Sequence, residues 1–316
     1  MEMEMEIEKP RLMAFARARM ITDATTKAHQ IVCMTSKDLI EFRGEKEVDC
    51  IVESIKWWFD ENGKDAYAVI GISGGKDSTI AAALCAKALG PDRVYGVLLP
   101  NRENDADFND VLGVCEYLKI KSIVIPIRRV YDVLRHNVIK YTNSKIVDSN
   151  GVVINNGASD FYENDSMLQN IPPRIRMTML YAVAAGLKNG GRVINTSNFS
   201  ESFIGYCTKY GDTAGDFSPL GMYTATEVVA IGDLLGLPEH LVHKAPADGL
   251  CGKTDEENLG FSYESLDKFI KEGTSGDEET DKNVEMRFIN NIHKMNMSMP
   301  VSFRKGGISD YYDDVD

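Results

Sequence analysis

The sequence predicts an α/β protein with a doubly wound, mainly parallel sheet and a helical N-terminal region. Continuous apolar runs, typical of strands covered by helices on both faces, alternate with amphipathic segments. A glycine-rich turn connects the first of these runs to an alanine-rich segment, as in a βαβ unit. No repeat occurs at the periods of about 20 to 50 residues that mark solenoids. We therefore expect one domain over 1–316, with a helical region at 1–65, a core at 66–300 and an acidic tail at 301–316.

The expected elements follow in chain order. Apolar residues from Val48 to Trp58 fall on one face of a helix, and core packing is the simplest role for that face. A helix over 77–89 ends at Gly90 and Pro91, which cannot continue it. The other expected helices span 107–117 and 175–187, and the expected strands span 66–72, 94–99, 122–127 and 192–196.

Three segments, 142–170, 205–221 and 245–260, are rich in glycine or polar residues and predict long irregular loops. Loops of this length in a compact domain are functional or disordered. Ligands of doubly wound sheets bind beyond the carboxyl ends of the strands. The loops that follow the strands are therefore where we look for a site.

Composition excludes several classes of function. The 316 residues include 48 acidic and 35 basic side chains, a net charge of −13, which argues against nucleic acid as a partner. The longest uncharged apolar stretch, 177–187, is far shorter than the roughly 20 residues that cross a bilayer. The acidic N-terminus is unlike a secretory signal, so we expect a cytoplasmic protein.

Cysteine and histidine usage gives no sign of a disulfide or zinc framework. The six cysteines are scattered without a C-x-x-C pair, which is typical of reduced thiols. His240 and His243 form the one close histidine pair, and we interpret them as surface residues rather than metal ligands.

The most informative segment is G-I-S-G-G-K-D-S at 71–78, between an expected strand and an expected helix. Its glycines allow backbone N–H groups to face an anion, and the helix N-terminus adds a positive dipole end. The segment is neither a Walker A loop nor a G-x-G-x-x-G motif, and S-G-G alone also occurs in ordinary turns. Phosphates would repel Asp77 unless a divalent cation lay between them, so Asp77 is a candidate magnesium ligand.

The motif S-G-G-x-D-S resembles the pyrophosphate loop of the N-type ATP pyrophosphatases, which cleave ATP between its α and β phosphates. A second block at 195–212, N-T-S-N-F-S-E-S-F-I-G-Y-C-T-K-Y-G-D, resembles the signature of NAD synthetase. Further blocks match that family in order, at 170–177, 216–220, 244–249, 254–263 and 293–294. The resemblance implies an adenine nucleotide alpha hydrolase-like fold. It is to the short, ammonia-dependent form of the family, which has no glutaminase domain.

The resemblance implies amide formation in two steps. The nicotinate carboxylate of deamido-NAD attacks the α-phosphorus of ATP and releases pyrophosphate, and ammonia then displaces AMP from the adenylated carboxylate to give NAD. A carboxylate does not react with ammonia at neutral pH, so adenylation supplies the leaving group. Mg²⁺ is the implied cofactor and ATP the cosubstrate. A homodimer with substrate sites at the subunit interface is typical of the family.

The resemblance also implies roles for particular residues. Magnesium would be held by Asp77 and Glu201, and Asp77, Glu201 and Asp216 would be the catalytic residues. ATP would contact Gly71, Ile72, Ser73, Gly74, Gly75, Lys76, Asp77, Ser78 and Thr196. Deamido-NAD would contact Arg174, Lys209, Asp216, His293 and Lys294. Plainer interpretations remain for four of these residues: Glu201 as a solvated helix residue, Thr196 as a structural residue at a strand end, and His293 with Lys294 as a surface pair.

Several positions depart from the family pattern. Alanine stands at 225 and 247, where the family commonly has a lysine and a threonine or serine that contact ATP; Lys76 or Lys253 are candidates for the missing charge. Pro172 and Pro173 precede Arg174 and predict a helix start there. Arg174 and Arg176 cannot share one helix face, and Arg174 is the preferred substrate contact. The alternatives are another ATP pyrophosphatase that forms a different C–N bond, and a nucleotide-binding sensor without catalysis.

Overall fold

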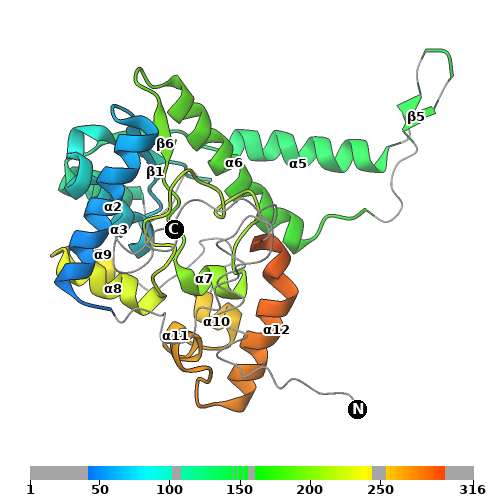
Figure 1. The fold of residues 1–316 in the computed structure, drawn as a ribbon. Helices are drawn as coiled ribbons and strands as arrows, with labels where there is room; N and C mark the ends of the chain where they lie inside the picture. Colours follow the sequence, from blue (N-terminus) through cyan, green and yellow to red (C-terminus); the bar gives the residue numbers. More distant parts are fainter. Residues whose placement is uncertain are drawn as a thin grey trace, which may run out of the picture.

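The structure is a computed structural model that describes residues 42–101, 108–144, 146–147, 149–151, 153–155, 161–243 and 254–295 (Figure 1). Its central sheet has four parallel strands in the order β3-β2-β1-β6. The strands are β1 (Tyr67–Gly71), β2 (Val94–Leu98), β3 (Lys121–Val124) and β6 (Gly191–Val193). The chain moves outward from β1 to β3 and returns on the other side of β1 as β6. The strand order therefore reverses at β1, where doubly wound folds bind their ligands.

Helices cover both faces of this sheet, which confirms the predicted fold class. One face packs against α2 (Glu45–Gly63), α3 (Lys76–Leu89), α4 (Phe108–Leu118), α8 (Ala225–Leu234) and α9 (Glu239–Val242). The other face packs against α6 (Asp165–Gly186). In β1, Ala68 and Ile70 belong to the first core and Val69 to the second. This alternation, with both sides buried, explains the continuous apolar run in the sequence.

The predicted helical face of the N-terminal region is confirmed in α2. Its apolar residues from Val48 to Trp58 are buried in the first core. The Trp58 ring stacks on Phe217, with ring centroids 5.1 Å apart. Helix α3 ends as predicted: Gly90 takes φ 85° and donates its backbone N–H to the carbonyl oxygen of Ala86, and the short 3-10 helix η2 (Pro91–Arg93) follows.

Helix α6 corrects one prediction. It begins at Asp165, where the Asn164 side chain caps it by accepting the N–H of Met167 at 2.9 Å, so Pro172 and Pro173 lie inside the helix rather than at its start. Prolines inside a helix remove hydrogen bonds and cost about 3 kcal/mol. Burial of Ile171, Pro172 and neighbouring apolar residues against the sheet offsets this cost.

The predicted irregular segments are only partly irregular. No helix or strand lies in 205–221, as predicted. By contrast, 142–170 contains the antiparallel strands β4 (Ile146–Val147) and β5 (Val153–Asn155) and the start of α6. Within 245–260, the described part forms α10 (Asp255–Leu259), which begins with a capping box between Thr254 and Glu257. Spacing arguments missed this helix because it is barely more than one turn long.

A smaller core lies beside the sheet domain. It is built by α7 (Phe199–Ile204), α10, α11 (Tyr263–Glu272) and α12 (Glu278–Met295), around Phe203, Leu266 and Phe269. Because α7 follows β6 after a short loop, this second core fixes the position of the residues at the carboxyl end of the sheet.

Helix α5 (Arg128–Asn143) projects from the body, with the β4–β5 pair at its far end (Figure 1). None of its residues is buried, although several are apolar. Together with the edge strand β3 it leaves a group of apolar side chains exposed: Ile123, Val124, Val130, Val133, Leu134 and Tyr141.

Other predictions fall partly outside the described residues. The described cysteines, Cys50, Cys85, Cys115 and Cys207, are free thiols, as predicted. Within the described part of the chain, no helix is both long and apolar enough to cross a membrane. The remaining two cysteines, the first 41 residues, the acidic tail, Ala247 and Lys253 lie outside the described residues.

Candidate active site

The predicted anion loop lies at the carboxyl end of β1 and leads into α3. Gly74 has φ 80°, a conformation that favours glycine, and Gly75 is the N-cap of α3 without a side-chain cap. Ser73 and Ser78 close the loop: their hydroxyl oxygens are 3.0 Å apart, and the Ser73 hydroxyl accepts the N–H of Gly75 at 3.2 Å. The N–H groups of the first turn of α3 are thus available to an anion such as a phosphate.

Asp77, in the first turn of α3, has a partner on each carboxylate oxygen. Lys76 Nζ donates to Oδ2 at 2.8 Å, and Asn198 Nδ2 donates to Oδ1 at 3.1 Å. Lys76 is buried, with 6% of its side chain exposed, and its Nζ lies 5.6 Å from the centroid of the Tyr263 ring. The carboxylate is therefore held between the anion loop and the segment after β6.

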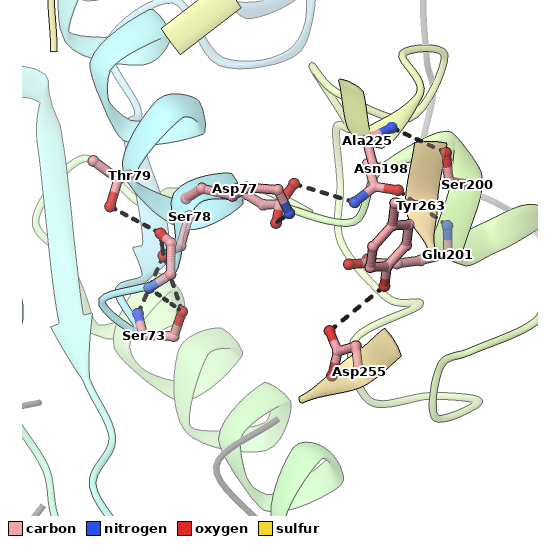
Figure 2. A network of polar contacts seen from close by, with 12 residues as sticks. Ser73, Asp77, Ser78, Thr79, Asn198, Ser200, Glu201, Ala225, Asp255 and Tyr263 are labelled. Carbon is pink, nitrogen blue, oxygen red and sulfur yellow. Dashed lines mark hydrogen bonds and ion pairs between the residues drawn. The ribbon is translucent and has the colours of Figure 1, made fainter. Parts of the chain in front are cut away.

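Asn198 links the two predicted magnesium ligands (Figure 2). It is fully buried and is the N-cap of α7, where its side-chain oxygen accepts the N–H of Glu201 at 3.0 Å. Its amide nitrogen reaches Asp77 in the other direction. Sequence reasoning missed Asn198, although an asparagine three residues before a glutamate is a typical helix-start signal.

The charges at this site are unbalanced. Burial and the nearby charge of Asp77 raise the pKa of Glu201 well above its usual range. Burial opposes the charge of Lys76, but the carboxylates of Asp77, Glu201 and Asp255 outweigh it and raise the pKa of the ammonium. Burial is the larger cause of this shift and the neighbouring carboxylate the smaller one, and a bound cation would offset both.

This donor set fits a divalent cation that is shared with a nucleotide. Mg²⁺ is usually bound by one or two carboxylates together with substrate phosphates. Among the residues that the structure describes, no group of three or more His, Cys, Asp or Glu side chains is arranged to hold a metal alone. The pair of Asp77 and Glu201 beside an anion loop matches the shared arrangement rather than a metal cage.

Helix α7, which carries Glu201, is fixed by a second polar network. The Ser200 hydroxyl donates to Asp267 of α11 and accepts the N–H of Ala225 at 2.9 Å, while Asp267 accepts the N–H of Thr226 at 2.8 Å. Ala225 is buried in the second core at the start of α8. Ala225, where the resemblance led us to expect a lysine, is thus a buried core residue at the N-terminus of α8.

Four of the residues predicted to bind deamido-NAD lie together. The backbone carbonyl oxygen of Lys209 accepts a hydrogen bond from Arg174 Nε at 3.1 Å, and Lys209 Nζ donates to the backbone carbonyl of His293 at 3.1 Å. Lys294 Nζ donates to the backbone carbonyl of Gly205 at 2.8 Å. Helices α6 and α12 and the 205–221 loop therefore meet in a basic cluster formed by Arg174, Lys209, His293 and Lys294.

Three other residues from the sequence analysis, Asp216, Arg176 and Thr196, do not contact the basic cluster through any hydrogen bond described here. Asp216 accepts the N–H of Val193 at 2.7 Å and the hydroxyl of Tyr181 at 3.3 Å, so it is tied to β6 and α6. Arg176 points away from Arg174 and donates to the backbone carbonyl of Leu99 at 3.2 Å, as the helix spacing predicted. Thr196 is half-buried just after β6.

An anion loop at the switch point of a parallel sheet, with two carboxylates converging on it, is the arrangement of an α/β enzyme that binds a nucleotide through its phosphates. The profile described as NAD synthase matches residues 47–300, and the chain belongs to this family.

Individual relatives agree with this assignment. The chain is 38% identical to an NH(3)-dependent NAD(+) synthetase of Pyrococcus furiosus over 72% of its own length and 77% of that protein. It is 33% identical to the enzyme of the same description from Archaeoglobus fulgidus over 80% and 95%. Among solved structures, it resembles an NMN synthetase from Francisella tularensis (TM-score 0.68, 26% identity, 83% and 100% covered). An NH3-dependent NAD synthetase from Campylobacter jejuni is also similar (TM-score 0.62, 26% identity, 81% and 98% covered).

Proposed function

We propose that this protein is a ligase that forms a C–N bond: it amidates deamido-NAD with ammonia to give NAD, and converts ATP to AMP and pyrophosphate. Family membership supports the reaction. The observation that carries it in this chain is the bridge from Asp77 through Asn198 to Glu201, beside the anion loop.

The residues of the loop bind and orient ATP. Backbone N–H groups at the start of α3 and the hydroxyls of Ser73 and Ser78 hold the β and γ phosphates, while Thr196 lies at the end of the neighbouring strand. Asp77 and Glu201 would hold Mg²⁺, which neutralises phosphate charge. Catalysis of this step rests on positioning and charge compensation.

The basic cluster binds deamido-NAD. Arg174, Lys209 and Lys294 present cationic groups from three elements, and His293 adds an imidazole; the dinucleotide brings two phosphates and a carboxylate. The carboxylate attacks the α-phosphorus, the bond from that phosphorus to the bridging oxygen breaks, and pyrophosphate leaves. Ammonia then attacks the carbonyl carbon, AMP leaves with the electron pair, and the extra proton passes to solvent. Asp216 was predicted as a catalytic residue that contacts deamido-NAD; because its carboxylate accepts the N–H of Val193 and the hydroxyl of Tyr181, we propose that it positions the substrate loop instead.

We also propose that the protein is a homodimer, in which a second copy of the chain covers the exposed apolar side chains of β3 and α5. Adjacent exposed apolar side chains mark association surfaces in water-soluble proteins. Val133→Lys places a charge there and is expected to convert a dimer to a monomer in sedimentation velocity. Leu234→Lys, an exposed leucine on α8, is the control and should leave the sedimentation unchanged. A wild-type protein that sediments as a monomer would contradict the proposed dimer.

We propose a cytoplasmic location, which the free thiols of the described cysteines support.

One assay tests the reaction. The protein is incubated with ATP, Mg²⁺, ammonium and deamido-NAD, and AMP, pyrophosphate and NAD are followed by mass spectrometry. We expect equal amounts of AMP and NAD. Asp77→Asn and Glu201→Gln should each lose turnover by about a hundredfold or more, with unchanged circular dichroism. Near-normal rates in both variants would contradict the metal-ligand roles.

The substrate is compared in the same assay. Because the chain resembles an NMN synthetase along that protein's whole length, nicotinate mononucleotide is the second candidate substrate. The ratio of the two kcat/KM values decides between them. Binding of ATP without AMP formation would support a nucleotide sensor, and AMP formation only with another acceptor would support a different ligase of the superfamily.

A further inference from the structure

Lys76 occupies an unusual position for a lysine. It is the first residue of α3, where the dipole end of the helix is positive and disfavours a cation, and its side chain is almost fully buried. Such a group is stable only when anions surround it. Its Nζ contacts Asp77 Oδ2 at 2.8 Å and lies 5.6 Å from the Tyr263 ring centroid. The ammonium is therefore held inside the site rather than turned to solvent.

The contacts of Lys76 compete with those expected of a metal ion. Asp77 has two carboxylate oxygens: Asn198 donates to Oδ1, and Lys76 donates to Oδ2. A metal cation that binds Oδ2 is repelled by the Lys76 ammonium at the same oxygen, so metal binding favours the departure of Lys76 from Asp77. Glu201 and Asp255 act electrostatically on the same ammonium, so its displacement also changes the charge around them. The displaced ammonium needs another anion, because a buried unpaired charge is costly.

We propose that the Lys76 ammonium occupies the place of the metal ion beside Asp77 until the nucleotide binds. In the resting protein Lys76 neutralises Asp77 and weakens the binding of free Mg²⁺. When ATP binds with its metal, Lys76 leaves Asp77 for a phosphate oxygen of the nucleotide in the loop that contains it. Metal and nucleotide binding are therefore coupled through one side chain. The phosphate half of this inference rests on ATP binding in the proposed function, and the competition at Asp77 rests on the proposed role of Asp77 as a metal ligand.

The test measures Mn²⁺ binding by electron paramagnetic resonance, in the full chain and without turnover. The variants are Lys76→Met, which removes the charge, and Lys76→Gln, which removes it but keeps a donor toward Asp77. Lys87→Met is the matched control, because Lys87 is exposed on the same helix. Without nucleotide, we expect both Lys76 variants to bind Mn²⁺ at least about tenfold more tightly than wild type, and Lys87→Met to stay within about twofold.

A nucleotide arm tests the second half of the proposal. With α,β-methylene ATP, which resists cleavage, wild-type affinity for Mn²⁺ should rise strongly. In the Lys76 variants this rise should be about tenfold smaller, and the analogue itself should bind more weakly. In the double variant Asp77→Asn with Lys76→Met, the extra Mn²⁺ affinity should disappear, because the gained site includes Asp77.

Equal Mn²⁺ affinity in wild type and both Lys76 variants, with folded protein by circular dichroism, would overturn the proposal. So would a nucleotide effect on Mn²⁺ that is unchanged by the Lys76 substitutions. Failure of the proposed function would appear differently, as an absence of AMP and NAD in the turnover assay whatever the metal affinities are.

Discussion

Asn198→Ala removes the side chain that joins the two halves of the site. In the folded protein the Asn198 amide is fully buried, caps α7 at 3.0 Å and donates to the Asp77 carboxylate at 3.1 Å. Loss of an N-cap costs about 1 kcal/mol. Loss of a hydrogen bond to a charged group costs about 1.5–3 kcal/mol. We therefore expect the free energy of unfolding to fall by about 3 kcal/mol.

Asn198→Ser separates the two contributions. Serine caps helices about as well as asparagine, but its hydroxyl is too short to hold both α7 and Asp77. The serine variant should lose less stability than the alanine variant, by about 1 kcal/mol. Both variants should lose turnover about equally, because neither fixes Asp77 relative to Glu201.

Urea unfolding followed by circular dichroism measures the stability of each variant, and the AMP assay measures turnover. If Asn198→Ala unfolded within about 0.5 kcal/mol of wild type, the bonds at Asn198 would not be stabilising. If Asn198→Ser turned over at the wild-type rate, the bond to Asp77 would not position the carboxylate. Either result would refute the reasoning that Asn198 links the Asp77 carboxylate to the backbone N–H of Glu201.

Two further substitutions test other parts of the site. Gly205 follows α7 with φ 61°, and a Cβ there would lie 2.3 Å from Asn291 Cβ. Gly205→Ala should therefore lower the free energy of unfolding, measured with urea, by about 2 kcal/mol or more. An unchanged urea midpoint would show that α12 can shift to make room for the added methyl group. Burial and the contact with Asp216 raise the pKa of Tyr181 from near 10 to about 12, so the folded state favours the neutral phenol. This contribution is complete below pH 10 and is lost as pH rises toward 12. Stability measured over this range should therefore fall less steeply in Tyr181→Phe, and equal slopes would contradict the assignment.

Local sequence patterns predicted the central βαβ unit well. The run before Gly71, the glycine turn and the alanine-rich helix are short-range features, and each is observed within one or two residues of its expected limits. Asp77 was predicted from the charge of the anion loop and Glu201 from the family resemblance, and the fold brings the Asp77 carboxylate and the Glu201 backbone N–H to the Asn198 side chain.

The structural features that the sequence patterns did not predict involve contacts between residues that are distant in sequence. The start of α6 was misplaced because prolines are typical of a helix start, whereas burial of Ile171 in the core at the sheet stabilises a helix that continues through them. The contact of Lys76 with the Tyr263 ring depends on the start of α11 lying beside the start of α3. No spacing rule within either segment contains that information.

The strand order has a consequence for how the chain folds. Asp77 and Asn198 are separated by 121 residues, yet they meet because β1 and β6 are neighbours. Joining these strands closes a loop that contains β2, β3 and α3 to α6, and such non-local pairing forms slowly. During synthesis the anion loop and α3 leave the ribosome well before Glu201 does. The two carboxylates therefore depend on a long-range contact, and the site cannot be complete before β6 and α7 have been synthesised.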